Sequence, residues 1–181
     1  ALAPLLDSWA RAGYVVASPT FPLTAKDGSG DSLRSESVDQ AADLRAVIDA
    51  VTRASRTQGD PLSGRVDVER VGVAGMSLGG LAVYALISNS CCKESRVDAA
   101  IVMAGVRREF PDERYGRNDA PVLLLQGDAD PGYHNSVDAY PELAPPKWFV
   151  TLHGSRHAPP FEVPNGPEAP FVRTGTRDFW D

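Results

Sequence analysis

The sequence predicts an α/β domain with a mostly parallel sheet and helices on both of its faces. Short, continuous apolar runs recur along the chain, for example over residues 99–104 and 122–125, and such runs are typical of strands buried on both faces. Segments of helical periodicity separate these runs, and residues 36–53 are the clearest of them. Strands that alternate with helices indicate crossover connections and therefore a parallel sheet.

The chain begins with a predicted helix over residues 2–13, in which large apolar side chains form one stripe before Gly13 ends it. Residues 14–17 are apolar and predict a short strand, whereas residues 23–34 are rich in Gly and Asp and predict a loop. The amphipathic helix over residues 36–53 comes next.

An apolar run over residues 71–74 predicts the next strand, and residues 81–86 predict the helix that follows it. Residues 107–119 are charged and predict a surface excursion. The remaining elements are strands over residues 99–104, 122–125 and 148–152, a helix over residues 136–143 and a closing helix over residues 171–180.

A chain of 181 residues can bury a substantial core, and we expect a single domain over residues 1–181. The formal net charge of −6 argues against nucleic acid or an anionic membrane surface as a partner, since both require a basic face. No apolar run is long enough to span a bilayer. We therefore expect a soluble protein, with export and oligomeric state left open.

The only two cysteines, Cys91 and Cys92, are adjacent, and we expect two half-buried free thiols after a helix. A disulfide between neighbours requires an eight-membered ring, and this vicinal disulfide is the first alternative. A zinc site with His153 and His157 is the second, although these spacings match no metal-binding pattern. No metal and no cofactor are therefore expected.

Residues 75–80, Gly-Met-Ser-Leu-Gly-Gly, stand between a predicted strand and a predicted helix. In this context Gly-x-Ser-x-Gly predicts a nucleophile elbow, in which a sharp turn holds the serine in a strained backbone conformation. Gly75 and Gly79 leave room for the strand and the helix to approach each other closely. Ser77 would lie at the positive end of a helix, which makes it a candidate nucleophile.

A serine hydroxyl needs a base to accept its proton and a third group to orient that base. Of the three histidines, His157 is the candidate base because it lies in a loop beyond the last predicted strand. His153 belongs to the end of that strand and is expected to be a packed or surface residue. His134 follows the acid candidates too closely and is expected in the pocket or at the surface.

Two aspartates, Asp128 and Asp130, follow the predicted strand over residues 122–125. In a parallel sheet, chemistry collects beyond the C-terminal ends of the strands. We prefer Asp130 as the orienting acid, because it stands far enough out to turn toward a histidine loop. Asp128 remains the alternative, although its place directly after Gly127 suits it to capping the turn.

Several motifs in this order carry a resemblance to a known family. They are the elbow at residues 75–80, Gly-Asp-Ala-Asp at 127–130 and Gly-Ser-Arg-His at 154–157, with residues 9–16 similar to a first covering helix and its strand. The chain resembles the α/β-hydrolase fold. Within that fold it resembles the dienelactone-hydrolase-like and polyester-hydrolase (cutinase-like) branch of the carboxylesterases.

The resemblance implies a serine esterase that cleaves carboxylic esters through an acyl-enzyme. It assigns Ser77 as nucleophile, His157 as base and Asp130 as orienting acid, in agreement with the choice made from the residues. The backbone N–H of Leu78 would donate to the oxyanion, and a small-molecule ester would be the partner.

Two departures from the family pattern restrict the range of substrates that the resemblance implies. Dienelactone hydrolases proper carry cysteine where this chain has Ser77, so that particular activity is not expected. Polyester-active relatives place a tryptophan shortly after the strand that corresponds to residues 99–104, whereas this chain has none there, and a small ester is the expected substrate. The candidate pocket residues are Met76, Leu78, Phe21 and Tyr133.

The chain opens at Ala1 with no initiator Met, directly before the helix predicted over residues 2–13. In the family, the second oxyanion donor comes from the loop before the first covering helix, and that loop would precede Ala1. The strand that leads into the loop would precede it too, and two buried sheet edges would then lack partners. We therefore expect that the sequence is a piece of a longer protein, and that residues 1–181 alone are unstable or inactive.

Two rival functions stay open at this stage. The same triad serves lipases, polyester hydrolases, acyltransferases and peptidases, because the fold sets the machinery and not the substrate. A catalytically impaired binding module on a hydrolase fold is the second rival, although candidates for all three members of the triad are present.

Overall fold

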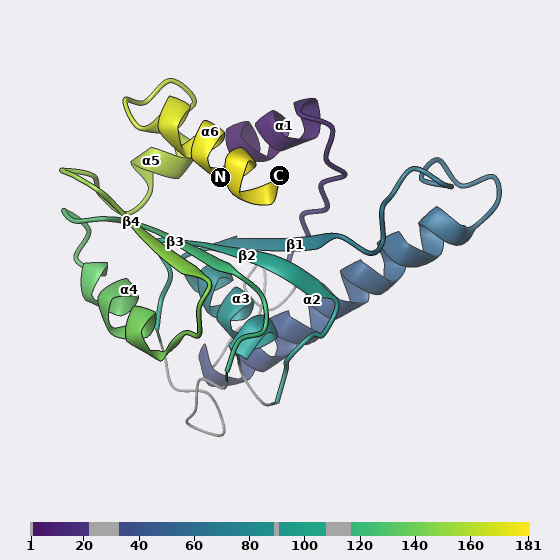
Figure 1. The fold of residues 1–181 in the computed structure, drawn as a ribbon, viewed down its shortest axis with the longest axis horizontal. Helices are drawn as coiled ribbons and strands as arrows, with labels where there is room; N and C mark the ends of the chain where they lie inside the picture. The colour runs from purple at the N-terminus through teal and green to yellow at the C-terminus, as the bar shows by residue number, and fades with distance from the viewer. Residues whose placement is uncertain (1, 22–32, 89–90, 108–116) are drawn as a thin grey trace.

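The computed structural model describes residues 2–21, 33–88, 91–107 and 117–181, with side chains from residue 39 onward in the second range. At its centre lies a four-stranded parallel sheet in the order β1-β2-β3-β4 (Figure 1). The C-terminal ends of the strands share one edge, and the predicted α/β class is confirmed. The strands are β1 (Val71–Met76), β2 (Val97–Met103), β3 (Val122–Gly127) and β4 (Lys147–Leu152).

Helices cover both faces of this sheet, as predicted (Figure 1). Because alternate residues of a strand face opposite sides, Leu124 packs into one core and Leu123 into the other. One face of the sheet carries α2 (Leu33–Arg56), α3 (Leu78–Ser88), α4 (Tyr133–Ala139) and the 3-10 helix η1 (Tyr140–Glu142), and the other carries α1 (Ala3–Arg11), α5 (Pro159–Glu162) and α6 (Ala169–Trp180).

In the ranges that the structure describes, no helix combines the length and the apolar character needed to cross a bilayer.

Helix α3 fixes the position of the predicted elbow. Every residue from Gly80 to Ser88 is buried, because the helix lies between the sheet and α2. A helix that is apolar all round requires such a position. Its first residue, Leu78, follows the C-terminal end of β1 after a single intervening residue.

The predicted strand over residues 14–17 is wrong. These residues take part in no strand ladder, and Val15 is 44% exposed. A strand depends on backbone hydrogen bonds to a neighbour, and in the described sheet β1 pairs with β2 alone. Tyr14 and Val16 instead pack against the core on the α1 and α6 face, and the Tyr14 amide donates back to the carbonyl of Trp9.

The other predicted elements differ from the observed ones mainly at their ends. The helix predicted over residues 136–143 begins earlier, as α4, and continues as η1. The loop predicted over residues 23–34 and the surface excursion over residues 107–119 fall mostly outside the described residues.

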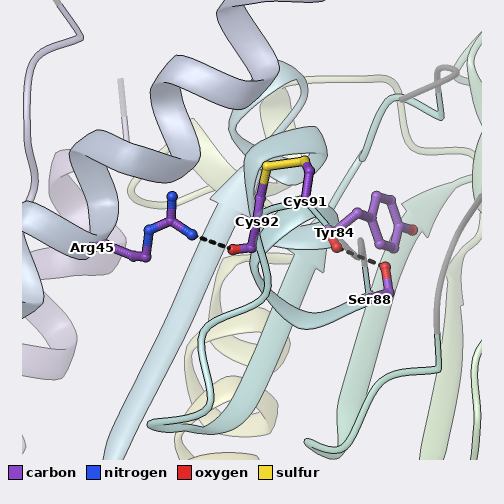
Figure 2. Close-up of a disulfide and its surroundings, with 5 residues drawn as sticks. All are labelled: Arg45, Tyr84, Ser88, Cys91 and Cys92. Atoms are coloured by element: carbon purple, nitrogen blue, oxygen red, sulfur yellow. Dashed lines mark hydrogen bonds between the residues drawn. A yellow bond between two sulfur atoms is a disulfide. The ribbon is translucent and has the colours of Figure 1, made fainter. Parts of the chain in front are cut away.

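The prediction of two free thiols at Cys91 and Cys92 is also wrong, because the structure joins them in the vicinal disulfide (Figure 2). The turn after α3 brings the neighbouring side chains together, with Cys92 buried and its carbonyl accepting a hydrogen bond from the Arg45 guanidinium at 3.0 Å. The zinc alternative finds no support in this geometry. The cysteines stand between α3 and the start of β2, whereas His153 and His157 follow the end of β4, and the N-terminal and C-terminal ends of the strands lie at opposite sides of a parallel sheet.

Candidate active site

Ser77 is the single residue between β1 and α3. Its φ is +57°, in the left-handed region that a residue with a Cβ rarely adopts, as expected for an elbow. Hydrogen bonds hold the turn on both sides: the Ser77 amide donates to the Met103 carbonyl at 3.0 Å, and the Ser77 carbonyl accepts from the Val106 amide at 3.2 Å. The strained residue is therefore anchored to β2 and to the segment after it.

The close approach of strand and helix involves a different pair of glycines from the one expected. A Cβ at Gly75 would overlap the carbonyl of Gly79, and a Cβ at Gly80 would lie 2.9 Å from the Cα of Gly105. A Cβ at Gly79 would meet nothing within 4 Å. The expectation that Gly79 leaves the necessary room is thus wrong, since Gly80 is the residue that faces β2.

This difference predicts opposite results for two alanine substitutions. We expect Gly75→Ala to lower the free energy of unfolding by about 3 kcal/mol, because the new methyl group meets rigid backbone. Gly79→Ala should be neutral or stabilising by about 0.5–1 kcal/mol, since alanine is the better helix residue. Urea unfolding monitored by circular dichroism measures both. Equal destabilisation by the two variants would contradict this account of the turn.

The two predicted residues Asp130 and His157 lie next to each other in the loops that follow β3 and β4. His157 Nδ1 is 2.6 Å from Asp130 Oδ2. The Asp130 side chain is 4% exposed and the His157 side chain is 40% exposed, so the pair is covered on its acid side and open on its imidazole side. Since Nδ1 faces the carboxylate, Nε2 is the ring nitrogen left for another partner.

A second aspartate–histidine pair lies beside the first. His153 Nδ1 is 2.8 Å from Asp128 Oδ2, and the Gly154 amide donates to Asp128 Oδ1 at 2.7 Å. The His153 side chain is 87% exposed, so this pair lies at the surface. His134 is also exposed, on α4, with its Nδ1 3.2 Å from the carbonyl of Pro131.

The two loops are pinned to each other by their backbones. The Ala129 amide donates to the Ser155 carbonyl at 3.1 Å, and the Asp128 amide donates to the Leu152 carbonyl at 3.3 Å. A Cβ at Gly127 would overlap the Ser155 carbonyl, so only glycine permits this approach. The loop contacts thereby set the separation of the acid from the histidine.

Opposing effects act on the Asp130 carboxyl. Burial by itself raises the pKa of Asp130, because it disfavours the charged form. Hydrogen bonds from the Gly132 amide, His157 and Gln126 outweigh burial and hold this pKa below its ordinary value. The carboxylate is therefore ionised at neutral pH, as an acceptor for an imidazole N–H must be.

The start of α3 offers free backbone donors beside Ser77. Across the part of the chain that is described, the amides of Leu78 and Gly79 donate to no carbonyl. The first N–H groups of a helix lack intrahelical partners and carry its positive end, where negative charge is stabilised. The predicted oxyanion donor, the Leu78 N–H, is thus available.

The structure does not join Ser77 to the acid–histidine pair by a hydrogen bond. The hydroxyl of Ser77 has no hydrogen-bond partner among the described residues. Ser77 and the acid–histidine pair both lie at the C-terminal edge of the sheet, because Ser77 follows β1 and His157 follows β4.

The candidate pocket residues belong to different parts of the described fold. Met76 packs toward the α1 and α6 face, Leu78 toward the opposite core, and Phe21 is half-buried outside the regular elements. The Tyr133 ring packs on Phe149, with its hydroxyl 3.0 Å from Thr151 Oγ1. Two small cavities in the described structure, one beneath α5 and α6 and one before β2, are lined by none of these four candidates.

Two polar residues behind the acid, Gln126 and Ser136, were not predicted from the sequence. Gln126 and Ser136 are fully buried, and Gln126 Nε2 donates to Asp130 Oδ2 at 2.6 Å. A glutamine at the end of the apolar run of β3 is the only signal the sequence offers for this contact. A buried amide in such a run requires a polar partner.

Comparison with known families shows which family the chain belongs to. The family model described as "Dienelactone hydrolase family" matches residues 3–141. The chain belongs to the dienelactone hydrolase family. Its fold is accordingly the α/β-hydrolase fold, and the family places the chain among hydrolases of the α/β type. The match to the dienelactone hydrolase family includes Ser77 and Asp130, whereas His157 lies beyond it. A search of curated proteins finds no match.

Proposed function

We propose that the protein is a serine esterase that cleaves small carboxylic esters through Ser77, His157 and Asp130. One observation carries the proposal: the 2.6 Å contact between Asp130 and His157 lies at the sheet edge that also holds Ser77 in its left-handed turn. An activated nucleophile, a base and an orienting acid in this arrangement are the requirements of acyl transfer.

In the proposed mechanism, Ser77 Oγ attacks the ester carbonyl carbon while its proton passes to His157 Nε2. The tetrahedral oxyanion accepts a hydrogen bond from the Leu78 amide. When the intermediate collapses, the carbon–oxygen bond to the alcohol breaks, and His157 returns the proton to the leaving oxygen. Water then attacks the acyl-enzyme by the same route, which releases the acid and restores Ser77.

Asp130 keeps His157 in the tautomer that this mechanism requires. Its ionised carboxylate accepts from Nδ1–H, so Nε2 carries the lone pair that takes the serine proton. The missing bond between Ser77 and His157 is compatible with the mechanism, since such bonds are often long before substrate binds and tighten in the complex.

A small ester is the substrate class that the surroundings favour. Directly after β2 the described residues are Gly105, Val106 and Arg107, and none of these three supplies an aromatic side chain on which a polymer chain could pack. We therefore expect short acyl chains to be turned over faster than long ones in a panel of p-nitrophenyl esters, and a peptide amide to be cleaved least.

Fluorophosphonate labelling of the folded chain tests the proposal. These reagents phosphorylate serines that an adjacent base activates, so peptide mapping by mass spectrometry should find one adduct, on Ser77. Heat-unfolded protein should not react, because labelling depends on the assembled site. Absence of labelling in the folded protein, or an adduct on another serine, would refute the assignment.

A further inference from the structure

We propose that Gln126 is a positioning residue, whose side-chain amide fixes the orientation in which Asp130 meets His157. The geometric part of this inference stands on the contacts alone, and its consequence for turnover rests on the proposed esterase function. The side-chain hydrogen bonds of Gln126 go to Asp130 and Ser136, so its effect on the reaction would pass through Asp130.

Gln126 is fully buried in β3, at the end of a run of apolar residues. Both ends of its amide are used: Nε2 donates to Asp130 Oδ2 at 2.6 Å, and Oε1 accepts from the Ser136 hydroxyl at 2.9 Å. Burying an amide without such partners costs about 1–3 kcal/mol, so a glutamine here is stable only with these contacts.

The carboxylate dictates which way the amide points. An ionised carboxylate is acceptor-only, so the amide NH₂ of Gln126, and not its oxygen, must face Asp130. The Ser136 hydroxyl then donates to the oxygen at the other end. A chain of hydrogen bonds thus runs from α4 through β3 to the acid, and bonds in such a chain polarise one another.

The Asp130 side chain needs this support because its last torsion is soft. Rotation about the bond to the carboxylate has broad, shallow preferences. The Gly132 amide anchors Oδ1 at 2.8 Å, and Gln126 anchors Oδ2, the same oxygen that His157 contacts. Without Gln126, Oδ2 would be held by the imidazole alone, so the carboxylate plane and the His157 ring could turn together; Gln126 fixes this oxygen independently of His157.

Three variants test the inference. Gln126→Met keeps the length of the side chain and removes both hydrogen bonds, whereas Ser136→Ala leaves Gln126 in place and releases its far end. Ser88→Ala is the matched control, since Ser88 is a similarly buried helix serine whose hydroxyl donates to the Tyr84 carbonyl (Figure 2) and, among the described residues, does not contact Asp130 or Gln126.

We expect Gln126→Met to lower kcat about 10- to 100-fold with KM nearly unchanged, because a small misplacement of the catalytic group affects the transition state most. Ser136→Ala should lower kcat in the same direction by about 3- to 10-fold, because the anchor is loosened and not removed. Ser88→Ala should leave kcat unchanged. If Gln126→Met does not fold, the comparison of kcat between Ser136→Ala and Ser88→Ala decides whether the hydrogen-bond chain through Gln126 affects turnover.

A spectroscopic measurement separates this inference from the proposed function. Proton NMR of the hydrogen-bonded Nδ1–H of His157, assigned by its loss in His157→Ala, reports the contact with Asp130 whether or not an ester is cleaved. We expect this resonance to shift or broaden in Gln126→Met and Ser136→Ala, and to stay unchanged in Ser88→Ala. If the wild-type chain has no esterase activity but the resonance still shifts in Gln126→Met and Ser136→Ala, the proposed esterase function is refuted and the positioning role is supported. An unchanged resonance in a folded Ser136→Ala or Gln126→Met chain would overturn the inference.

Discussion

Replacement of Ser77 by alanine should reduce ester turnover by about 10⁴- to 10⁶-fold and leave the stability of the protein nearly unchanged. The loss of activity is large because the hydroxyl supplies the bond-forming oxygen. The stability should change little because the hydroxyl has no hydrogen-bond partner within the described structure, so its removal leaves no polar group unpaired.

A second substitution at the same position separates activity from stability. Ser77 has a left-handed φ of +57°, which costs a residue with a side chain about 1 kcal/mol or more and costs glycine nothing. Ser77→Gly should therefore be as inactive as Ser77→Ala and more stable than the wild type by about 1 kcal/mol. A rise in stability together with a loss of function is the expected behaviour of a strained functional residue.

Steady-state kinetics with p-nitrophenyl acetate and thermal unfolding measure the two effects. Heat-unfolded wild-type protein gives the background rate, because a mildly activated ester also reacts with free nucleophiles. If Ser77→Ala retained most of the wild-type turnover, the hydroxyl would have no part in the reaction. If Ser77→Gly were less stable than Ser77→Ala, the turn would not be strained as its φ indicates.

The parts of the fold that the sequence predicted well depend on local requirements. The elbow needs a strand, a strained residue and a helix within residues 71–88, and that whole pattern is present in one continuous segment. The acid and histidine loops follow from a general property of parallel sheets, since the ends of β3 and β4 must share an edge. The contact of Asp130 with His157 agrees with this expectation, while their catalytic roles remain a proposal.

The predictions that were wrong depend on partners distant in the sequence. Residues 14–17 have the composition of a strand, but a strand also needs a neighbouring backbone, which no property of the segment itself reveals. The role assigned to Gly79 belongs to Gly80, because the close neighbour is Gly105, which follows β2. Gln126 was missed for the same reason: the packing of α4 on the sheet brings its partner Ser136 within reach.

The two aspartates that follow β3 provide a matched pair for the acid. We expect Asp130→Asn to lower kcat by about 10³- to 10⁴-fold, and Asp128→Asn to leave kcat within about threefold of wild type. Both substitutions remove one negative charge from the same short loop, so the long-range electrostatic effect is similar. The two variants differ in what the lost carboxylate contacts.

Asparagine at position 130 cannot satisfy the donors that meet there. Three N–H donors converge on the carboxylate, from His157, the Gln126 side chain and the Gly132 amide. An asparagine has one acceptor oxygen, and its NH₂ group must then face at least one of these donors. Turned toward His157, the NH₂ group favours the ring tautomer with the proton on Nε2, which cannot accept the proton of Ser77.

Asparagine at position 128 meets no such conflict. Its oxygen can still accept from the Gly154 amide, and the NH₂ group can face solvent or the exposed ring of His153. Measurement of kcat and of the unfolding midpoint for both variants therefore distinguishes the two pairs. Equal losses would indicate that the loop, and not one carboxylate, is responsible. A larger loss in Asp128→Asn would transfer the proposed roles to the pair of Asp128 and His153, and the buried contact of Asp130 would then be structural.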